Sequence, residues 1–367
     1  MRSEFLANLR LKTVLRYNKG MHWQIHGHDW AVELLRKHVS GNKLRHAYLF
    51  TGPEGVGRQT LAIRFAQAIN CDNPPEPGDY CGDCRACRQL ASLTHPDLSL
   101  LQPEEGHKDI LIDQVRTLQR ALALSPYSAA YRIALLPDFQ RATTQAANAL
   151  LKTLEEPPGR VILLLTALTP EGLLPTITSR CEVIRLRPAA IDETRAYLQT
   201  HHSLDDDQAR LLAHISGGRI GAAIRLTEDP STLVNRRAHL ETLLQLLDAP
   251  RYERFKRIGS FLQALDKPRH KIGEVLSIWL SFWRDVFLRA SSESLPPVNL
   301  DLLTQIDQVA LQVPAKKARE LILAHEQALQ HLDANVNLQL LLETLMLQLP
   351  RLTVSHETAF VDDGDGD

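Results

Sequence analysis

Short apolar runs alternate with segments of helical period between residues 48 and 185. Several runs contain β-branched residues and are bounded by turn-forming ones, as buried strands are. The segment before Pro157 instead repeats its apolar positions every three or four residues, which puts them on one helix face. The pattern predicts an α/β domain in which helices cover a mainly parallel sheet. The expected strands are residues 48–51, 98–102, 132–136, 161–166 and 182–185.

After Pro188 the strand-like runs give way to helical periodicity. Residues 191–198 and 205–215 have the pattern of short helices, and Gly217-Gly218 separates them from a further helix. From about residue 231 nearly every segment is helical. We expect five regions: a basic extension at 1–20, the α/β domain at 21–188, a small helical domain at 189–229, an all-helical domain at 230–352 and an acidic tail at 353–367.

Both ends of the chain are polar. Residues 1–20 hold five basic side chains and one acidic one, without the long apolar stretch of a signal peptide. We expect this extension to be disordered or to precede a start at Met21, and contact with DNA is the functional alternative. The acidic, glycine-containing tail is expected to be solvated.

The composition is that of an ordinary globular protein, with 44% hydrophobic and 23% charged residues. A formal net charge of −1 argues against a surface devoted to coating nucleic acid. No apolar run reaches the roughly 20 residues of a membrane span. Five cysteines are too few for a disulfide scaffold, and their clustering indicates metal ligation in a reducing compartment, which we expect to be the cytoplasm.

A glycine-rich loop follows the first expected strand and opens a helix, which is the context that a phosphate-binding loop requires. Its glycines allow backbone N–H groups to curl around an anion. The usual lysine is replaced by Arg58, and the usual Mg²⁺-binding hydroxyl by Gln59, with Thr60 one position late. We therefore expect nucleotide binding to be weak or absent. The glycines concerned are Gly52, Gly55 and Gly57.

The strand at 132–136 runs into Pro137-Asp138-Phe139, where a hydrolytic ATPase carries a metal-binding Asp followed by an acid that positions water. Two registers are open. If Pro137 takes the metal position, Asp138 stands for the acid. If Asp138 takes the metal position, Phe139 replaces the acid. Neither register completes the pair, and Asp138 could also be an ordinary polar residue at a strand end. We expect a nucleotide-binding fold without hydrolysis.

Four cysteines follow one another with the spacing C-x9-C-x2-C-x2-C: Cys71, Cys81, Cys84 and Cys87. Four thiolates suit tetrahedral Zn²⁺ and leave no coordination position open, so the ion is expected to be structural. The segment between the first two is rich in proline, and the metal would supply its order. Reduced cysteines in an apolar core are the alternative, which the polar neighbours oppose. His95 is a conceivable substitute ligand that we expect at a turn instead.

Together these motifs resemble the AAA+ clamp-loader subunits of the bacterial replicative DNA polymerase III. The resemblance covers about residues 21–225 with specific motifs and continues beyond them only as helical character. Besides the cysteines, it rests on residues 23–28 (WQIHGH), 46–53 (HAYLFTGP), 148–158 (NALLKTLEEPP) and 174–181 (LPTITSRC).

The resemblance implies a subunit of a five-membered ring that opens the sliding clamp and places it on primed DNA. Its partners would be the gamma or tau and the delta subunits. Residues 189–229 would be a lid, and residues 230–352 the helical collar through which subunits assemble. Arg180, in Ser179-Arg180-Cys181, would be an arginine finger for ATP bound by a neighbour, and a surface ion pair is the alternative. No local base favours Cys181 as a nucleophile.

One apolar stripe at helical spacing near the C-terminus fits either a collar interface or a private core: Leu338, Leu341, Leu342, Leu345 and Leu349. A second face of aromatic side chains is more typical of core than of a ligand site: Trp279, Trp283 and Phe287.

Three departures from the family pattern argue against ATP hydrolysis by this chain. The first is Arg58 in place of the lysine. The second is Pro137, which the family spacing puts at the metal position. The third is Gly221, which stands where the second domain of the ATPase subunits carries a sensing arginine. Arg219 is two positions away, about 200° around a helix, so we do not expect it to face the same phosphate. Thr166 could still fill the first sensor position.

The resemblance thus favours a non-hydrolysing member of the ring, with no ATPase activity of its own inside the polymerase holoenzyme. An active gamma or tau ATPase is the first alternative. A zinc-containing nucleic-acid-binding module is the second, and a scaffold in which Arg180 contributes nothing to catalysis is the third.

Overall fold

The computed structural model describes residues 22–264, 268–292, 295–333 and 336–352. The predicted basic extension and acidic tail lie outside the described residues. The chain divides into two compact units. Unit 1 is Met1–Tyr197 with Gly218–Ala223, and unit 2 is Leu198–Gly217 with Ile224–Asp367. This division crosses the helical domain expected at 189–229, and the domain boundaries stay a prediction.

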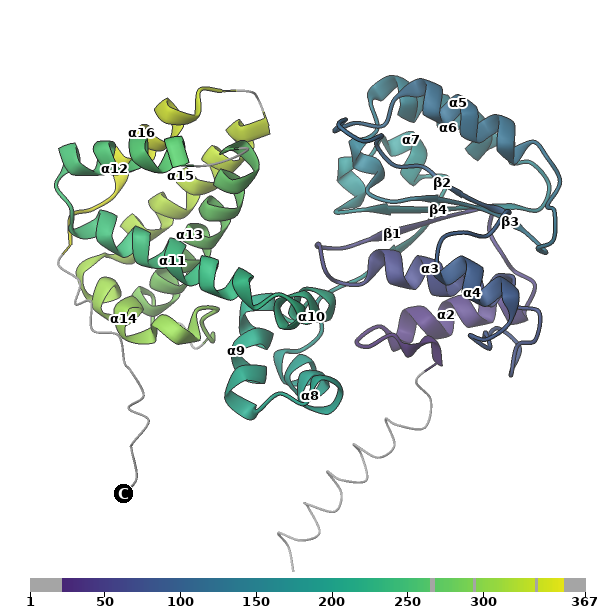
Figure 1. Ribbon diagram of the computed structural model, residues 1–367, viewed down its shortest axis with the longest axis horizontal. Helices are drawn as coiled ribbons and strands as arrows, with labels where there is room; N and C mark the ends of the chain where they lie inside the picture. The colour runs from purple at the N-terminus through teal and green to yellow at the C-terminus, as the bar shows by residue number, and fades with distance from the viewer. Residues whose placement is uncertain (1–21, 265–267, 293–294, 334–335, 353–367) are drawn as a thin grey trace, which may run out of the picture. The chain divides into compact units, whose positions relative to one another are not determined.

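Unit 1 is built on one parallel sheet whose strands follow the order β2-β3-β4-β1-β5 (Figure 1). Its central strand β4 pairs with β3 and β1 on either side. The five strands lie where the hydrophobic pattern predicts them, with ends that differ by at most two residues: β1 (Ala47–Thr51), β2 (Leu98–Leu100), β3 (Arg132–Leu136), β4 (Val161–Ala167) and β5 (Glu182–Arg185).

Helices cover both faces of the sheet, α2 to α4 on one side and α5 to α7 on the other (Figure 1). Alternate strand residues serve the two layers: Tyr48 and Phe50 pack toward α2 and α3, whereas Ala47 and Leu49 pack toward α5 and α6. The helices of this unit are α2 (Asp29–Ser40), α3 (Arg58–Ile69), α4 (Arg85–Ala91), α5 (Ile112–Leu122), α6 (Thr144–Glu155) and α7 (Pro175–Thr178), with the 3₁₀ turns η1 (His22–Gln24), η2 (Phe139–Arg141) and η3 (Pro170–Gly172).

Unit 2 is helical throughout its described residues. Its core is centred on Trp279, Phe282 and Trp283, and the Nε1 of Trp279 donates to the His239 carbonyl at 2.8 Å. The described helices are α9 (Asp206–Ser216), α11 (Pro230–Asp248), α12 (Arg251–Ala264), α13 (Pro268–Ala290), η4 (Leu300–Leu302), α14 (Leu303–Gln312), α15 (Ala315–Asp333) and α16 (Leu338–Gln348). Two further helices, α8 (Ile191–His202) and α10 (Ile220–Glu228), cross the unit boundary.

The C-terminal leucine stripe packs inside unit 2. Leu342, Leu345 and Leu349 are buried in its core, and Leu338 and Leu341 pack against that core. The private-core interpretation of this stripe is therefore confirmed. No helix among the described residues has the length and apolar character that crossing a membrane requires.

Candidate functional site

The glycine-rich loop joins the C-terminal end of β1 to the first turn of α3. Its backbone turns sharply, with φ of 79° at Gly55 and 103° at Gly57. A residue with a side chain rarely adopts these angles, so glycine is required for the turn. The loop thus lies between β1 and α3, as the motif requires, at the sheet edge where ligands of parallel α/β folds bind.

The charged residues predicted at this edge are brought together and bind one another. Arg58, the first residue of α3, is buried, and its Nη2 lies 3.0 Å from Oδ1 of Asp138. Asp138 follows β3, and its backbone N–H donates to Oγ1 of Thr166 on β4 at 2.9 Å. Arg58, which replaces the usual lysine, and Asp138, which stands at the acid position in one of the two registers, therefore form an internal ion pair.

Gln59, at the position of the usual Mg²⁺-binding hydroxyl, and Thr60, one position later, take no part in this ion pair. Gln59 and Thr60 are exposed in the first turn of α3. Neither side chain forms a hydrogen bond with any residue that the structure describes. Asp138 has a left-handed backbone, with φ of 46°.

In both registers of Pro137-Asp138-Phe139 there is one carboxylate beside the loop and not a pair, because the other residue is Pro137 or Phe139.

The start of α10 packs directly on the glycine-rich loop, within unit 1. Nη1 of Arg219 donates to the Glu54 carbonyl at 3.3 Å. A Cβ atom at Gly221 would lie 2.8 Å from the carbonyl oxygen of Gly55, so only glycine fits there without a shift. Sequence reasoning placed Arg219 away from the phosphate, and the structure adds that it binds a backbone acceptor of the loop.

His28 is a loop contact that sequence reasoning missed. Its buried ring lies with Nε2 2.9 Å from the carbonyl oxygen of Val56. Its position within the motif at 23–28 was the available signal, but the motif did not indicate which side chain reaches the loop.

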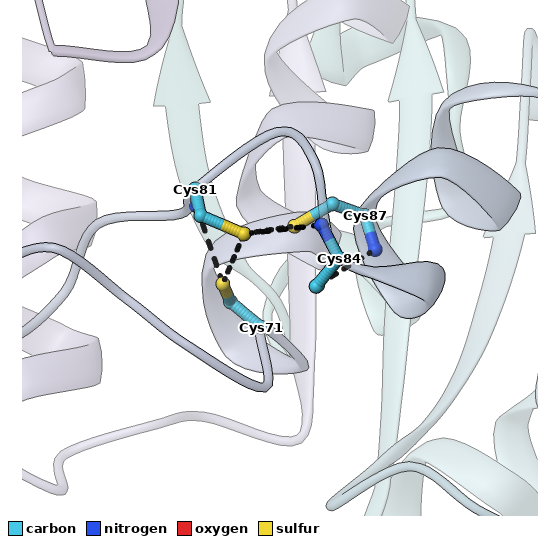
Figure 2. A group of neighbouring side chains, drawn as sticks. All are labelled: Cys71, Cys81, Cys84 and Cys87. Carbon is cyan, nitrogen blue, oxygen red and sulfur yellow. Dashed lines mark hydrogen bonds between the residues drawn. The ribbon is translucent and has the colours of Figure 1, made fainter.

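The four clustered cysteines gather between the end of α3 and the start of α4 (Figure 2). Their sulfur atoms all lie within 4.8 Å of one another. The sulfur of Cys81 lies 3.5 Å from that of Cys71 and 4.0 Å from that of Cys87. Four sulfurs at about 2.3 Å from a tetrahedral zinc ion are about 3.8 Å apart, so the group fits such an ion. The cluster can hold a metal ion.

Backbone N–H groups orient the sulfur atoms. The N–H groups of Cys81, Cys84 and Cys87 donate to sulfur atoms at 3.2 to 3.3 Å, and Cys84 caps α4 in this way. The bond from Cys84 N–H lowers the pKa of the Cys81 thiol to about 7. Burial instead raises the pKa of the Cys71 and Cys87 thiols, so a nearby cation is needed to hold these two as thiolates.

His95 lies at a turn outside this sulfur group, as expected. Its Nδ1 accepts a hydrogen bond from the Asp97 backbone N–H at 3.0 Å, and burial lowers the pKa of the ring.

The buried carboxylate of Asp97 organises the segment before β3. Burial alone would raise its pKa, but backbone N–H bonds from Ser128, Tyr127 and Ala129, together with the Arg132 charge, hold the pKa below its usual value. Asp97 therefore remains charged and fully bonded without a metal.

Arg180 follows α7 and is partly exposed. Its Nη2 lies 2.7 Å from Oε1 of Glu155, and its Nη1 donates to the Thr176 carbonyl at 2.8 Å. The surface ion pair considered from the sequence is thus present. Burial raises the pKa of the adjacent Cys181 thiol to about 12, which disfavours the nucleophilic thiolate at neutral pH.

A glycine loop between a strand and a helix, at the carboxyl edge of a parallel sheet, is the fold feature of the phosphate-loop class of α/β proteins. On this fold the chain carries an ion pair between Arg58 and Asp138 and a cluster of four cysteines.

Comparison with known proteins shows to which family of this class the chain belongs. The family model described as DNA polymerase III, delta subunit, matches residues 27–190. The Bacillus subtilis DNA polymerase III subunit delta' is 30% identical over 322 residues, which are 87% of this chain and 94% of the relative. The chain belongs to the DNA polymerase III delta-prime family.

Two further matches cover different shares of their proteins. The Pseudomonas aeruginosa DNA polymerase III subunit delta' is 46% identical over 136 residues, which are 37% of this chain and 41% of that protein. A solved Thermotoga maritima protein related to the DNA polymerase III gamma subunit has a TM-score of 0.45 at 20% identity, over 87% of this chain and 99% of its own.

Proposed function

We propose that this chain is the non-hydrolysing delta-prime subunit of a clamp loader, which helps place a sliding clamp on primed DNA. The observation that carries the proposal is the ion pair between Arg58 and Asp138 at 3.0 Å. Hydrolysis requires a cation that reaches the β and γ phosphates and an acid that positions water. Here the groups at those positions neutralise each other, and Pro137 takes the metal position.

Arg180 acts in trans, as an arginine finger at the nucleotide of a neighbouring subunit. A guanidinium beside the γ phosphate stabilises the charge that develops during phosphoryl transfer, a contribution of about 10³ to 10⁵ in rate. Partial exposure of Arg180 supports this role, since a finger must reach beyond its own chain.

The cysteine cluster holds a structural zinc ion. Cys71, Cys81, Cys84 and Cys87 would be its four ligands, which leaves no open position for catalysis. When bound, the ion cross-links a proline-rich segment that has few apolar side chains of its own.

The partners are gamma or tau and delta subunits, arranged with this chain in a ring of five. Residues 189–229 serve as the lid and residues 230–352 as the collar. The clamp and primed DNA are reached through the complex, and as a polymerase subunit the chain works in the cytoplasm.

One reconstitution tests the proposal. The purified chain is mixed with gamma or tau and delta subunits and a sliding clamp, and assembly, bound zinc and ATPase are measured in the same samples. We expect assembly, one zinc per chain and no ATP turnover by the chain alone. Turnover by the isolated chain at the rate of the motor subunits would instead support an active gamma or tau role.

Substitution of Arg180 tests the finger. Arg180→Ala should slow hydrolysis by about 10³-fold at the neighbour's site that it faces, while the ring still assembles. Arg187→Ala is the matched control, because Arg187 is exposed and forms no ion pair within the described part of the chain. Equal activity of both variants would reject the finger and leave the scaffold interpretation.

A further inference from the structure

The position of Glu155 is not explained by the stability of its own helix. Glu155 is the last residue of α6, where the carbonyl groups at the helix end carry partial negative charge. A carboxylate at this end is electrostatically unfavourable, and lysine or arginine is preferred there. The carboxylate therefore lies where the helix dipole disfavours it, and its ion-pair partner is Arg180, at 2.7 Å.

Buried neighbours bring the two charged side chains together. Leu154 precedes Glu155 and is 1% exposed, and Ile177 of α7 is fully buried in the same core cluster. Because Leu154 and Ile177 anchor α6 and α7 in one core cluster, Glu155 at the end of α6 and Arg180 in the turn that follows α7 are held close together.

We infer that Glu155 is a positioning residue that aims Arg180 at the neighbouring nucleotide, an inference that rests on the proposed finger role. Nη1 of Arg180 donates to the Thr176 carbonyl at 2.8 Å and to Oγ of Ser179 at 3.4 Å, and Nη2 donates to Glu155. Three fixed contacts hold a side chain that would otherwise sample many rotamers.

These contacts leave donors for a phosphate. A guanidinium has five N–H groups. Three of them are used here, and the other two have no acceptor among the described residues. A γ-phosphate oxygen from a neighbouring subunit can therefore bind Arg180 while Glu155 keeps the guanidinium in place. The lower mobility of Arg180 in this arrangement raises the fraction of encounters with the correct geometry.

The test compares variants in the reconstituted ring with clamp, primed DNA and ATP. Glu155→Ala should lower kcat for ATP by about two- to fivefold, the range that corresponds to an exposed ion pair, with little change in KM or in assembly. Glu155→Gln, which keeps an acceptor oxygen, should recover part of the loss. Glu156→Ala is the matched control, because Glu156 is exposed and forms no ion pair within the described chain, and it should retain full activity.

A double variant separates positioning from general stability. If Glu155 acts through Arg180, Glu155→Ala should cause no further loss in a chain that already carries Arg180→Ala. Additive losses, equal activity of the Glu155 and Glu156 variants, or a gain of activity on removal of Glu155 would each overturn the inference. If Arg180→Ala alone has no effect, the proposed finger role fails as well, so the two failures are distinguishable.

Discussion

The cysteine cluster and the phosphate loop are two polar sites of unit 1 that differ in what completes them. The cluster brings together four groups of one kind, with sulfur atoms within 4.8 Å of one another, and a cation is needed to hold the buried Cys71 and Cys87 as thiolates. The loop brings together groups of opposite charge, and Arg58 and Asp138 balance each other at 3.0 Å. One site thus gathers four groups of one kind that a cation can bind, whereas in the other two opposite charges pair within the chain and Nη1 of Arg58 stays buried without a hydrogen-bond partner among the described residues.

This difference fits the proposed function, in which the chain keeps a nucleotide-binding fold and does not hydrolyse ATP. A buried arginine without a partner would be costly, so the replacement of lysine by Arg58 is tolerated because Asp138 accepts it. The loop also makes contacts that involve no phosphate, from His28 to Val56 and from Arg219 to Glu54. These contacts hold the loop against η1–α2 and the start of α10 without a bound nucleotide.

The largest expected effect is at the cysteine cluster. Cys84→Ser should abolish binding of zinc and lower the melting temperature of the chain's first transition by about 10 °C or more, because several kcal/mol of ligation free energy are lost. Metal analysis and calorimetry of the same sample measure both quantities.

The control for this change is Cys181→Ala, since Cys181 lies outside the cluster. It should retain one zinc per chain. A full zinc content in the Cys84 variant would show that the cluster is not the metal site.

The next effect concerns Asp97, a buried acid that needs no metal. Asp97→Asn should destabilise the chain by about 2–4 kcal/mol at pH 7, because a charge-assisted set of N–H bonds and the partner of Arg132 are lost. Urea denaturation measures the difference. Asp109→Asn, at an exposed position, should change stability by no more than about 0.5 kcal/mol.

The pH dependence follows from the lowered pKa of Asp97. The unfolded chain binds the proton more tightly, so the contribution of Asp97 is complete above about pH 4 and is lost as the pH falls through the native pKa. The deficit of Asp97→Asn should therefore shrink in acid. A deficit that stays constant down to pH 2 would contradict this account.

A smaller effect is expected when the loop motif is restored. The double variant Arg58→Lys with Gln59→Thr frees Asp138 and supplies the missing lysine and hydroxyl, so binding of ATP with Mg²⁺ should tighten by about tenfold. Titration calorimetry measures the affinity. The variant should still not hydrolyse ATP, because Pro137 is unchanged. Unaltered affinity would mean that the contacts with α10, rather than the two replacements, close the site.

The smallest effect is the coupling between Arg58 and Asp138 themselves. A double-mutant cycle with alanine at each position should give about 0.5–1 kcal/mol, because Asp138 is 45% exposed and solvent screens the pair. The exposed pair of Arg116 with Asp113 is the control and should give less than about 0.5 kcal/mol. A coupling of zero between Arg58 and Asp138 would contradict the view that the phosphate loop, unlike the cysteine cluster, is stabilised by charges that pair within the chain.

Much of the fold could be predicted because its signals are local. Strands buried on both faces appear as short apolar runs, and all five lie where these runs predict them. The cysteine set could be predicted because three of its members lie within one or two turns of chain, where spacing restricts geometry. Arg58 and Asp138 were also identified as replacements within their motifs, but not as partners of each other.

The amino-acid sequence alone was sufficient for the parallel sheet, the grouping of the four cysteines and the departures from the ATPase motifs, because each is carried by neighbouring residues or by fixed spacing. The pairing of Arg58 with Asp138, the approach of Gly221 to Gly55 and the contact of Glu155 with Arg180 emerged only from the folded chain. These partners are 80, 166 and 25 positions apart. Their meeting depends on strand order and on how helices pack across the sheet, which no local pattern encodes.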